Sequence, residues 1–580
     1  MSNVTTVPRP QRWQTPFGDM SDVDVERVMA LQPFAGMDRS RFVAPMTLDG
    51  IVRHDMRVVR YRGGDIVVRE GDYGNSAFLI LSGRLRAILP PGLPSELLGR
   101  APEEPRSAWS ALSQLWRNPK MPEVRDAARY ARHGRAGDPG DDERTGIFMQ
   151  DLPRVLDRYE TITMQEGELF GEIAALGRTP RLVTVIADGD AELLEMRWQG
   201  LREIRLRDEA FRRHVETLYR TRSLHGHLRA TELFRHLPAE VLDAIADETL
   251  FETYGNFEWH ASYKRFAADP PEVRLAREPV IVGEGDYPDG LLLIRSGFGR
   301  VTKRFNHGER TLRYLGRGGV FGLAEILDNW QRSASGALDA TLRAVGYTDV
   351  LRVPTATVER HVLNSMSAAD LARVSRTVFL PGQGEARPEA GAAPIAAAST
   401  KQMDPELLEM LVDYRFVNAT AAMVINLERC VRCDACVDAC AQAHGNNPRF
   451  VRHGVRFGPI MIANACLHCA DPVCMIGCPT GAIHRSDRGG QVVVNDDTCI
   501  GCATCANSCP YDNIRMVEVR GADGRFIYDE TTRQPIRKAT KCDLCLDQPG
   551  GPACQRACPH DALARIDLRD PQQIAEWVQR

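Results

Sequence analysis

The stretch RCVRCDACVDAC, residues Arg429–Cys440, places four cysteines at intervals of three, three and four residues. The chain has 16 cysteines among its 580 residues, and the first of them is Cys430. Disulfide frameworks are typical of small secreted domains, whereas these thiols are confined to one end of a long chain. The clustering therefore predicts metal ligation.

Four such quartets follow one another, each opening with C-x-x-C and closing with a three-residue gap before its last cysteine. The quartets are Cys430, Cys433, Cys436 and Cys440; Cys466, Cys469, Cys474 and Cys478; Cys499, Cys502, Cys505 and Cys509; and Cys542, Cys545, Cys554 and Cys558. Cysteines at i, i+3 and i+6 wrap one cubane cluster, and a fourth cysteine before proline serves the other cluster of a two-cluster unit. Structural zinc usually takes two separated C-x-x-C pairs instead. Sixteen thiolates at four per cluster predict four [4Fe–4S] clusters.

Residues 404–580 resemble the four-cluster ferredoxin-like electron-transfer subunits of molybdopterin oxidoreductases and some hydrogenases. INLERCVRCDACVDAC and CLHCADPVCMIGCPTGAI are among the stretches that carry the resemblance. It implies an α+β ferredoxin fold in which three cysteines of one quartet share a cluster with the last cysteine of another. The implied sets are Cys430, Cys433, Cys436 with Cys558; Cys542, Cys545, Cys554 with Cys440; Cys466, Cys469, Cys474 with Cys509; and Cys499, Cys502, Cys505 with Cys478.

The cysteine-free part of the chain contains an internal repeat. EGDYGNSAFLILSG begins at Glu70 and EGDYPDGLLLIRSG at Glu284, and a second match pairs FGEIAAL at Phe170 with FGLAEIL at Phe321. Each copy has a turn signal, a β-rich apolar run and Ser-Gly, which is typical of antiparallel strands joined by tight turns. The first copy carries an insertion of about residues 90–160, and an insertion at a loop tip is tolerated.

Both copies resemble cyclic-nucleotide-binding domains, which implies two β-barrel domains of jelly-roll type with flanking helices. In the first copy, GELFGEIAALGRTPRLVTV (Gly167–Val185) resembles the family's phosphate-binding cassette. Gly171 allows close backbone approach, Glu172 is expected to accept from a ribose hydroxyl, and Arg181 is expected to pair with the phosphate. Leu182 is too bulky to favour guanine, so cyclic AMP is the candidate ligand.

The second copy lacks these groups. Leu323 stands where the first copy has Glu172, and Leu338 stands opposite Arg181. A buried anion without a cation is costly, so we predict that the second copy is structural and does not bind nucleotide.

These patterns divide the chain into an N-terminal tail (1–21), a first nucleotide-binding-like domain (22–222), a degenerate second one (223–379), an Ala/Pro-rich linker (380–403) and the iron–sulfur domain (404–580). The segment Gly200–Leu228 has apolar residues at helical spacing and is predicted to be one connector helix. No second helix with helix-turn-helix spacing stands beside it, which disfavours DNA binding.

The charge balance gives no case for nucleic-acid or membrane attraction, because 73 basic side chains stand against 77 acidic ones. The sequence contains no run of about 18 apolar residues, and its first residues do not form an export signal. We therefore expect a cytoplasmic protein with no membrane span and no nucleic-acid partner.

Taken together, the motifs favour an electron-transfer component of an oxidoreductase complex over a standalone catalyst. Its expected partners are a molybdopterin or hydrogenase-type catalytic subunit and a second electron carrier, with the nucleotide domains docking or gating it. The alternative is a signalling protein whose clusters sense redox state or oxygen, but four clusters suit a relay, since a sensor generally needs one. The histidines among the cysteines are expected at the surface or beside the ligands; they are His444, His453, His468, His484 and His560.

Overall fold

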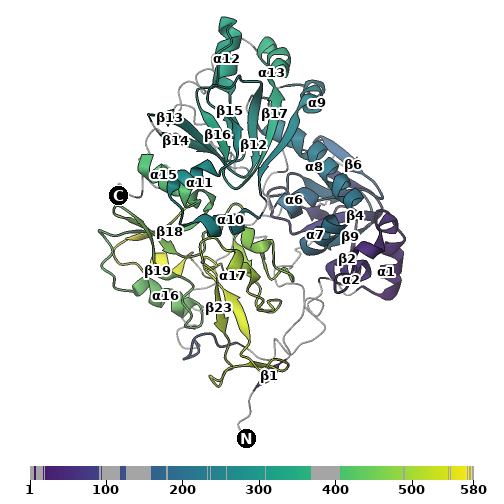
Figure 1. Ribbon diagram of the computed structural model, residues 1–580. Coiled ribbons are helices and arrows are strands. Elements are labelled where there is room, and N and C mark those ends of the chain that lie inside the picture. Colours follow the sequence, from purple (N-terminus) through teal and green to yellow (C-terminus); the bar gives the residue numbers. More distant parts are fainter. Residues whose placement is uncertain are drawn as a thin grey trace. The chain divides into compact units, whose positions relative to one another are not determined.

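Figure 1 shows the computed structural model of the chain. It describes residues 5–7, 17, 20–89, 93, 118–125, 158–177, 180–231, 233–234, 237–256, 258–306, 308–366, 405–486, 490–546, 548, 550–570, 573 and 577. Most of the predicted tail (1–21) and insertion (90–160), and all of the predicted linker (380–403), lie outside the described residues. The domain boundaries therefore stay predictions.

The described residues divide between two compact units. The first contains those of Met1–Tyr219, Met423–His468 and Pro472–Arg565; the second contains those of Arg220–Ala422, Cys469–Asp471 and Ile566–Arg580. The first copy of the repeat therefore shares a unit with most of the cysteine-rich region, and the second copy belongs to the other unit.

In the first copy, two four-stranded antiparallel sheets have the strand orders β2-β9-β4-β7 and β3-β8-β5-β6. The strands are β2 (Met56–Tyr61), β3 (Ile66–Val68), β4 (Ser76–Ser82), β5 (Leu85–Ile88), β6 (Thr161–Met164), β7 (Leu169–Phe170), β8 (Thr184–Ala187) and β9 (Ala191–Arg197). Strand β4, SAFLILS, is buried on both faces until its last residue, which suits a central strand rich in apolar side chains. Phe78 on β4 stacks on Phe170 on β7, with ring centroids 5.1 Å apart.

The second copy repeats this topology, with the strand orders β10-β17-β12-β15 and β11-β16-β13-β14. Its strands are β10 (Leu250–Gly255), β11 (Val280–Val282), β12 (Gly290–Ser296), β13 (Gly299–Phe305), β14 (Gly308–Leu315), β15 (Val320–Phe321), β16 (Thr341–Ala344) and β17 (Tyr347–Pro354). Even an irregularity recurs, because the register shifts between Ile80 and Ser82 in β4 and between Ile294 and Ser296 in β12. The expected jelly-roll domains are confirmed, but each consists of two open sheets and not of one closed barrel.

The cysteine-rich region is built around a four-stranded sheet of order β19-β20-β18-β26 and two hairpin-like pairs, β21-β22 and β23-β25. The strands are β18 (Ala422–Asn426), β19 (Val451–Phe457), β20 (Ile460–Asn464), β21 (Ile483–Arg485), β22 (Val492–Val494), β23 (Arg515–Glu518), β25 (Arg537–Thr540) and β26 (Leu563–Ile566). Its short helices are α16 (Ala435–Ala443), η7 (Val473–Met475), α17 (Thr504–Ser508) and α18 (Ala553–Arg556). Helix α16 packs against α18, and α17 packs against η7. The first quartet therefore lies beside the fourth, and the second quartet lies beside the third.

Helices flank the sheets of both copies. They are α1 (Asp22–Met29), α2 (Leu48–Asp55), α6 (Glu172–Gly177), α7 (Trp198–Arg207), α8 (Glu209–Ala230), α9 (Ala239–Glu248), α10 (Trp259–Phe266), α11 (Pro271–Ala276), α12 (Leu323–Arg332), α13 (Thr355–His361) and α15 (Pro405–Asp413). The single connector helix predicted over Gly200–Leu228 is wrong, because the helix ends at Arg207 and a new one begins after Asp208. The Asp208 carboxylate accepts a hydrogen bond from the Phe211 amide at 2.7 Å, which caps the new helix. Among the described residues, no helix combines the length and apolar character needed to cross a membrane.

Two segments from the N-terminal half lie on the cysteine-rich region within the first unit. Strand β1 (Thr6–Val7) pairs in parallel with β24 (Tyr528–Asp529). The described part of the insertion, residues 118–125, pairs with Arg520: the Arg125 amide donates to the Arg520 carbonyl at 2.7 Å, and the Arg520 amide donates to the Glu123 carbonyl at 2.9 Å. This part of the insertion is therefore a structural contact and not a free loop tip.

A buried ion pair also joins parts of the first unit. Arg197, at the end of β9, donates from Nε to the Asp55 carboxylate at the end of α2 at 2.8 Å. The two residues are 6% and 0% exposed. Arg197 also donates from Nη1 to the Thr480 carbonyl at 3.1 Å, two residues after Cys478. One guanidinium thus joins the first copy to the cysteine-rich region.

We predict that Asp55→Ala destabilises the first unit by about 3–5 kcal/mol, because it leaves the Arg197 charge buried without its carboxylate. Thermal unfolding of the full chain, followed by calorimetry, measures the loss. Glu209→Ala is the matched control, since Glu209 and Arg212 form an exposed pair on α8 that should contribute little. Equal shifts of the unfolding midpoint in both variants would contradict the prediction.

Candidate functional site

All sixteen cysteines are free thiols, and they lie in loops, turns and short helices. Cys436 and Cys440 lie in α16, Cys505 in α17 and Cys554 in α18. Because Cys436 and Cys440 are one helical turn apart, their side chains leave the same face of α16. The resemblance assigns Cys436 and Cys440 to two different clusters, so the two clusters would lie along the same side of this helix.

The backbone has a common conformation at the start of every quartet. The residue just before the second cysteine has a positive φ in each: Arg432 at 62°, His468 at 48°, Gly501 at 67° and Leu544 at 61°. This left-handed conformation is unfavourable for residues other than glycine. Turns of this kind direct successive amide N–H groups into one concavity, which suits an anionic iron–sulfur cluster. The sequence offered a signal for it only at Gly501.

The first and fourth quartets bring their thiols together. Burial and three neighbouring thiols raise the pKa of Cys440 to about 12. Those neighbours are Cys542, Cys554 and Cys545. Burial and the thiols of Cys554 and Cys558 raise the pKa of Cys436 to about 11. Cys440 thus faces the fourth quartet, as the crossed ligand sets require, and Cys436 lies near Cys558.

Thiols of the second and third quartets also lie close to one another. Burial and the thiols of Cys478, Cys499 and Cys502 raise the pKa of Cys505 to about 12. Burial, followed by the thiols of Cys509 and Cys466, also raises the pKa of Cys474 well above its usual range. Cys469 belongs to the second unit, so its place beside Cys466 and Cys474 stays a prediction.

A cavity lies at the group formed by the third quartet and the last cysteine of the second. Its lining includes the thiol-bearing residues Cys478, Cys499, Cys502 and Cys505. Apolar side chains such as Ile483, Val494 and Met516 complete the wall. Four free thiols around one apolar hollow fit a [4Fe–4S] cluster, whose irons would take the place of thiol protons.

Several N–H groups donate to the sulfur atoms. The Arg449 amide donates to Cys440 Sγ at 3.2 Å, the Ala553 amide to Cys545 Sγ at 3.4 Å and the Ala562 amide to Cys558 Sγ at 3.3 Å. Such donors stabilise a thiolate and tune a bound cluster. They provide a second reason, independent of spacing, to regard these cysteines as ligands.

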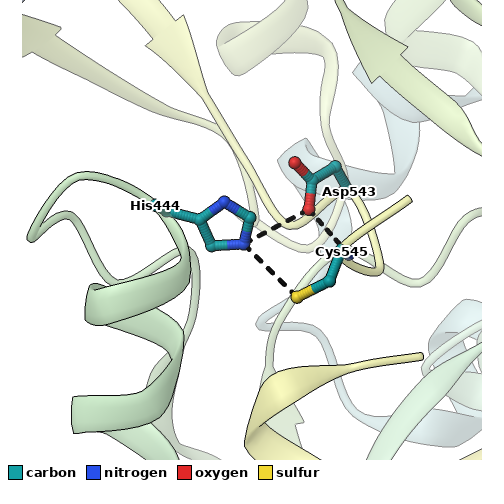
Figure 2. Close-up of side chains that lie close together, drawn as sticks. All are labelled: His444, Asp543 and Cys545. Carbon is teal, nitrogen blue, oxygen red and sulfur yellow. Dashed lines mark hydrogen bonds and ion pairs between the residues drawn. The ribbon is translucent and has the colours of Figure 1, made fainter. Parts of the chain in front are cut away.

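His444 lies beside one of these thiols (Figure 2). Its Nε2 is 3.5 Å from Cys545 Sγ and 3.4 Å from an Asp543 carboxylate oxygen. The three side chains could together hold a single metal ion, but the Cys545 thiol also lies near Cys440, with which the resemblance groups it. His444 is therefore best explained as a neighbour that orients the Cys545 sulfur. This position agrees with the expectation that the histidines lie at the surface or beside the ligands. His468, which precedes Cys469 in the sequence, is buried at 1% exposure and so does not lie at the surface.

The candidate nucleotide residues of the first copy converge on one place. Gly171 has a φ of 79° and immediately precedes α6, where Glu172 is 1% exposed. Arg181 is 7% exposed, and its guanidinium donates to the carbonyls of Gly171 at 2.8 Å and Ser76 at 2.7 Å. A Cβ on Gly171 would clash with this guanidinium. The buried cation and the buried carboxylate are thus set around a glycine that leaves room for them.

The second copy has leucines at the corresponding points. The Leu338 amide donates to the backbone carbonyl of Asp286 at 2.8 Å, and the Arg181 amide donates to the backbone carbonyl of Asp72 at 2.7 Å. The two positions are therefore equivalent. Leu323 begins α12 as Glu172 begins α6. Both leucines are buried, at 9% and 4% exposure, in apolar clusters. An apolar wall replaces the cation and the carboxylate.

Within the first unit, the loop beside the nucleotide residues contacts the cysteine-rich region. The Arg485 guanidinium, in β21, lies 4.2 Å from the centre of the Tyr73 ring. The Asn75 side chain donates to the Arg485 carbonyl at 3.4 Å. Tyr73 also bridges to Pro180, the residue before Arg181. A short path of contacts therefore links Arg181 to the hairpin that follows Cys478.

Comparisons with known proteins agree with both parts of the chain. The family model for the cyclic nucleotide-binding domain matches residues 272–364, and the model for the 4Fe-4S dicluster domain matches residues 459–567. The recognisable nucleotide-binding domain thus lies mid-chain, in the copy whose site residues are leucines, and not at the N-terminus as expected.

Similar proteins share the cysteine-rich region. Electron transport protein HydN of Escherichia coli K12 is 33% identical over 170 residues, which cover 27% of this chain and 94% of HydN. The arsenate respiratory reductase iron-sulfur subunit ArrB of Shewanella sp. ANA-3 is 31% identical over 196 residues, which cover 26% of this chain and 82% of ArrB. Protein NrfC of Escherichia coli K12 is 30% identical over 213 residues, which cover 34% of this chain and 82% of NrfC. A solved regulatory domain of Toxoplasma gondii PKA with cAMP aligns with 62% of this chain and 98% of its own at 14% identity and a TM-score of 0.21, too low to support an argument.

We predict that Cys440→Ala and Cys545→Ala alter the same cluster, because Cys440 lies beside Cys542, Cys545 and Cys554. Electron paramagnetic resonance of each reduced variant should show one common signal changed. Cys433→Ala is the comparison variant and should change a different signal. If Cys440→Ala changed the signal that is lost in Cys433→Ala, the crossed ligand sets would be wrong.

Proposed function

Since this chain belongs to the family of iron–sulfur electron-transfer proteins that includes HydN, we propose that it relays single electrons between a catalytic oxidoreductase subunit and a second carrier. The observation that supports this most is that sixteen free cysteines fall in four sequence quartets, with thiols of different quartets close enough to act on one another, as Cys440 and Cys542 do. In this proposal each group holds one [4Fe–4S] cluster, which supplies one-electron redox chemistry. The chain's own residues fix, shield and tune the clusters.

The exposure of the thiols suggests where electrons enter and leave. Cys433 and Cys502 are exposed, whereas every cysteine of the group formed by Cys440, Cys542, Cys545 and Cys554 is buried. We call the two groups that contain Cys433 and Cys502 the outer groups. The inner groups are that of Cys440 with Cys542, Cys545 and Cys554, and that of Cys466, Cys474 and Cys509. A relay with two accessible ends and a shielded middle suits transfer between two different partners.

The partner is proposed from the relatives. ArrB is by name an iron-sulfur subunit of a respiratory reductase, and the resemblance noted above extends to molybdopterin and hydrogenase-type enzymes. We infer a catalytic subunit of this kind as one partner. A redox-sensing role is less well supported, because a sensor does not require four clusters with two exposed ends.

Anaerobically purified chain should contain about sixteen iron and about sixteen acid-labile sulfide per molecule, the content of four cubanes. Metal analysis and sulfide determination measure both. Replacing Cys502 with Ala, at an exposed thiol, should lower the content of its own cluster and leave the other three. Stoichiometric zinc with little sulfide would rule out the relay.

The first copy of the repeat supports a second function, control of the relay by a cyclic nucleotide. Glu172 and Arg181 have the chemistry to bind a ribose hydroxyl and a phosphate, and the contacts of Tyr73 and Asn75 with Arg485 extend from that site to the cysteine-rich region. A ligand that draws Arg181 away from the carbonyls of Gly171 and Ser76 would change the loop that carries these contacts. Cyclic AMP is the proposed ligand, and the second copy is proposed not to bind it.

Calorimetry with cyclic AMP should therefore report one site per chain. Arg181→Leu removes a charge-assisted contact of roughly 1.5–3 kcal/mol, so affinity should fall about ten- to a hundredfold. Arg60→Leu is the control, because the Arg60 side chain is 84% exposed and pairs with Glu192 outside this site. Two sites per chain, or no heat with either cyclic AMP or cyclic GMP, would contradict the assignment.

A further inference from the structure

Arg565, in β26, lies between the two inner groups of thiols. Its Nη2 donates to Cys542 Sγ at 3.0 Å, and its Nη1 donates to the Cys466 carbonyl at 3.4 Å. The guanidinium also interacts with the Cys554 thiol. One permanently charged side chain thus touches residues of both inner groups.

The space around Arg565 holds further positive charge. Lys541 is 3% exposed and donates from Nζ to the carbonyls of Val492 and, at 2.7 Å, Cys542. His468 Nδ1 accepts from the Val492 amide at 3.1 Å. The cations Lys541, Arg565 and Arg485 all act on His468. Anionic clusters in the inner groups would interact favourably with these buried cations.

The cations beside the outer groups have carboxylates of their own. Arg452, near Cys430 and Cys436, lies 2.7 Å from the Asp434 carboxylate. Lys538, near Cys499, is acted on by Asp496 and Asp497. Their fields at the outer groups are therefore partly cancelled, whereas Arg565 makes its side-chain contact with sulfur itself.

Reduction adds one electron to a cluster, with no bond formed or broken, and the electron comes from a one-electron donor such as the partner. A nearby cation and an N–H donor to sulfur stabilise the reduced form more than the oxidised form, because the reduced form carries more negative charge. We propose that Arg565 is a positioning residue that raises the reduction potentials of both inner clusters, so that electrons delivered at an outer cluster come to rest in the middle of the relay. This inference rests on the proposed function, since it requires the clusters to be present.

The test is a dye-mediated redox titration of the anaerobic full chain, followed by electron paramagnetic resonance. The cysteine variants described above assign the signal of the Cys440 group, and Cys509→Ala assigns that of the Cys466 group. Arg565→Gln should make reduction of both inner clusters at least tenfold less favourable, a shift of about 59 mV to lower potential for one electron, and leave the outer clusters unchanged. Arg565→Lys keeps the charge and should shift them less.

Arg452→Gln is the matched control, because it removes a cation near an outer group whose charge Asp434 already balances. It should leave all four potentials almost unchanged. Unchanged inner potentials in Arg565→Gln with full iron content would overturn the proposal. So would loss of iron in both the Gln and the Lys variants, which would make Arg565 a structural residue. A wild-type chain without about sixteen iron would instead overturn the proposed function.

Discussion

Sulfur anions that lie close together in an apolar place repel one another and lose their hydration, so a fold that gathers them must supply compensating charge and N–H donors. The backbone turns left-handed before the second cysteine of each quartet, at residues such as Arg432 and Leu544. Amides such as that of Arg449 donate to sulfur, and Arg565 places a guanidinium at Cys542. The loops, short helices and buried cations of the cysteine-rich region all satisfy this one electrostatic requirement.

Carbonyl groups and an aromatic ring provide contacts between the first copy of the repeat and that region. Arg197 binds both the Asp55 carboxylate and the Thr480 carbonyl, and Arg485 lies over Tyr73. Such contacts hold two surfaces together without entering the ligand sets. In the proposed regulation, these contacts would connect the nucleotide site to the hairpin after Cys478.

Much of this arrangement could be predicted because it depends on local spacing. The quartets predicted the grouping of Cys440 with the fourth quartet through a family pattern, and the repeat predicted the equivalence of Leu338 and Arg181. Features set by contacts distant in the sequence could not be predicted. The break at Asp208, the pairing of residues 118–125 with Arg520 and the position of Arg565 between two groups depend on which surfaces meet in space. The left-handed residues were also missed, because Arg432, His468 and Leu544 are not residue types that signal a positive φ.

The pairing of β1 with β24 has a consequence for biosynthesis. Thr6 leaves the ribosome early, and its partner Tyr528 is made roughly 25 to 100 seconds later at typical translation rates of about 5–20 residues per second. The insertion segment at Val124 likewise cannot pair until Arg520 has been made. During that interval the nascent chain has these backbone donors and acceptors unsatisfied by their final partners, and the first copy lacks the surface on which Arg197 and Tyr73 rest. These two segments of the N-terminal half can therefore reach their final pairing only after the region around Arg520 and Tyr528 has been made.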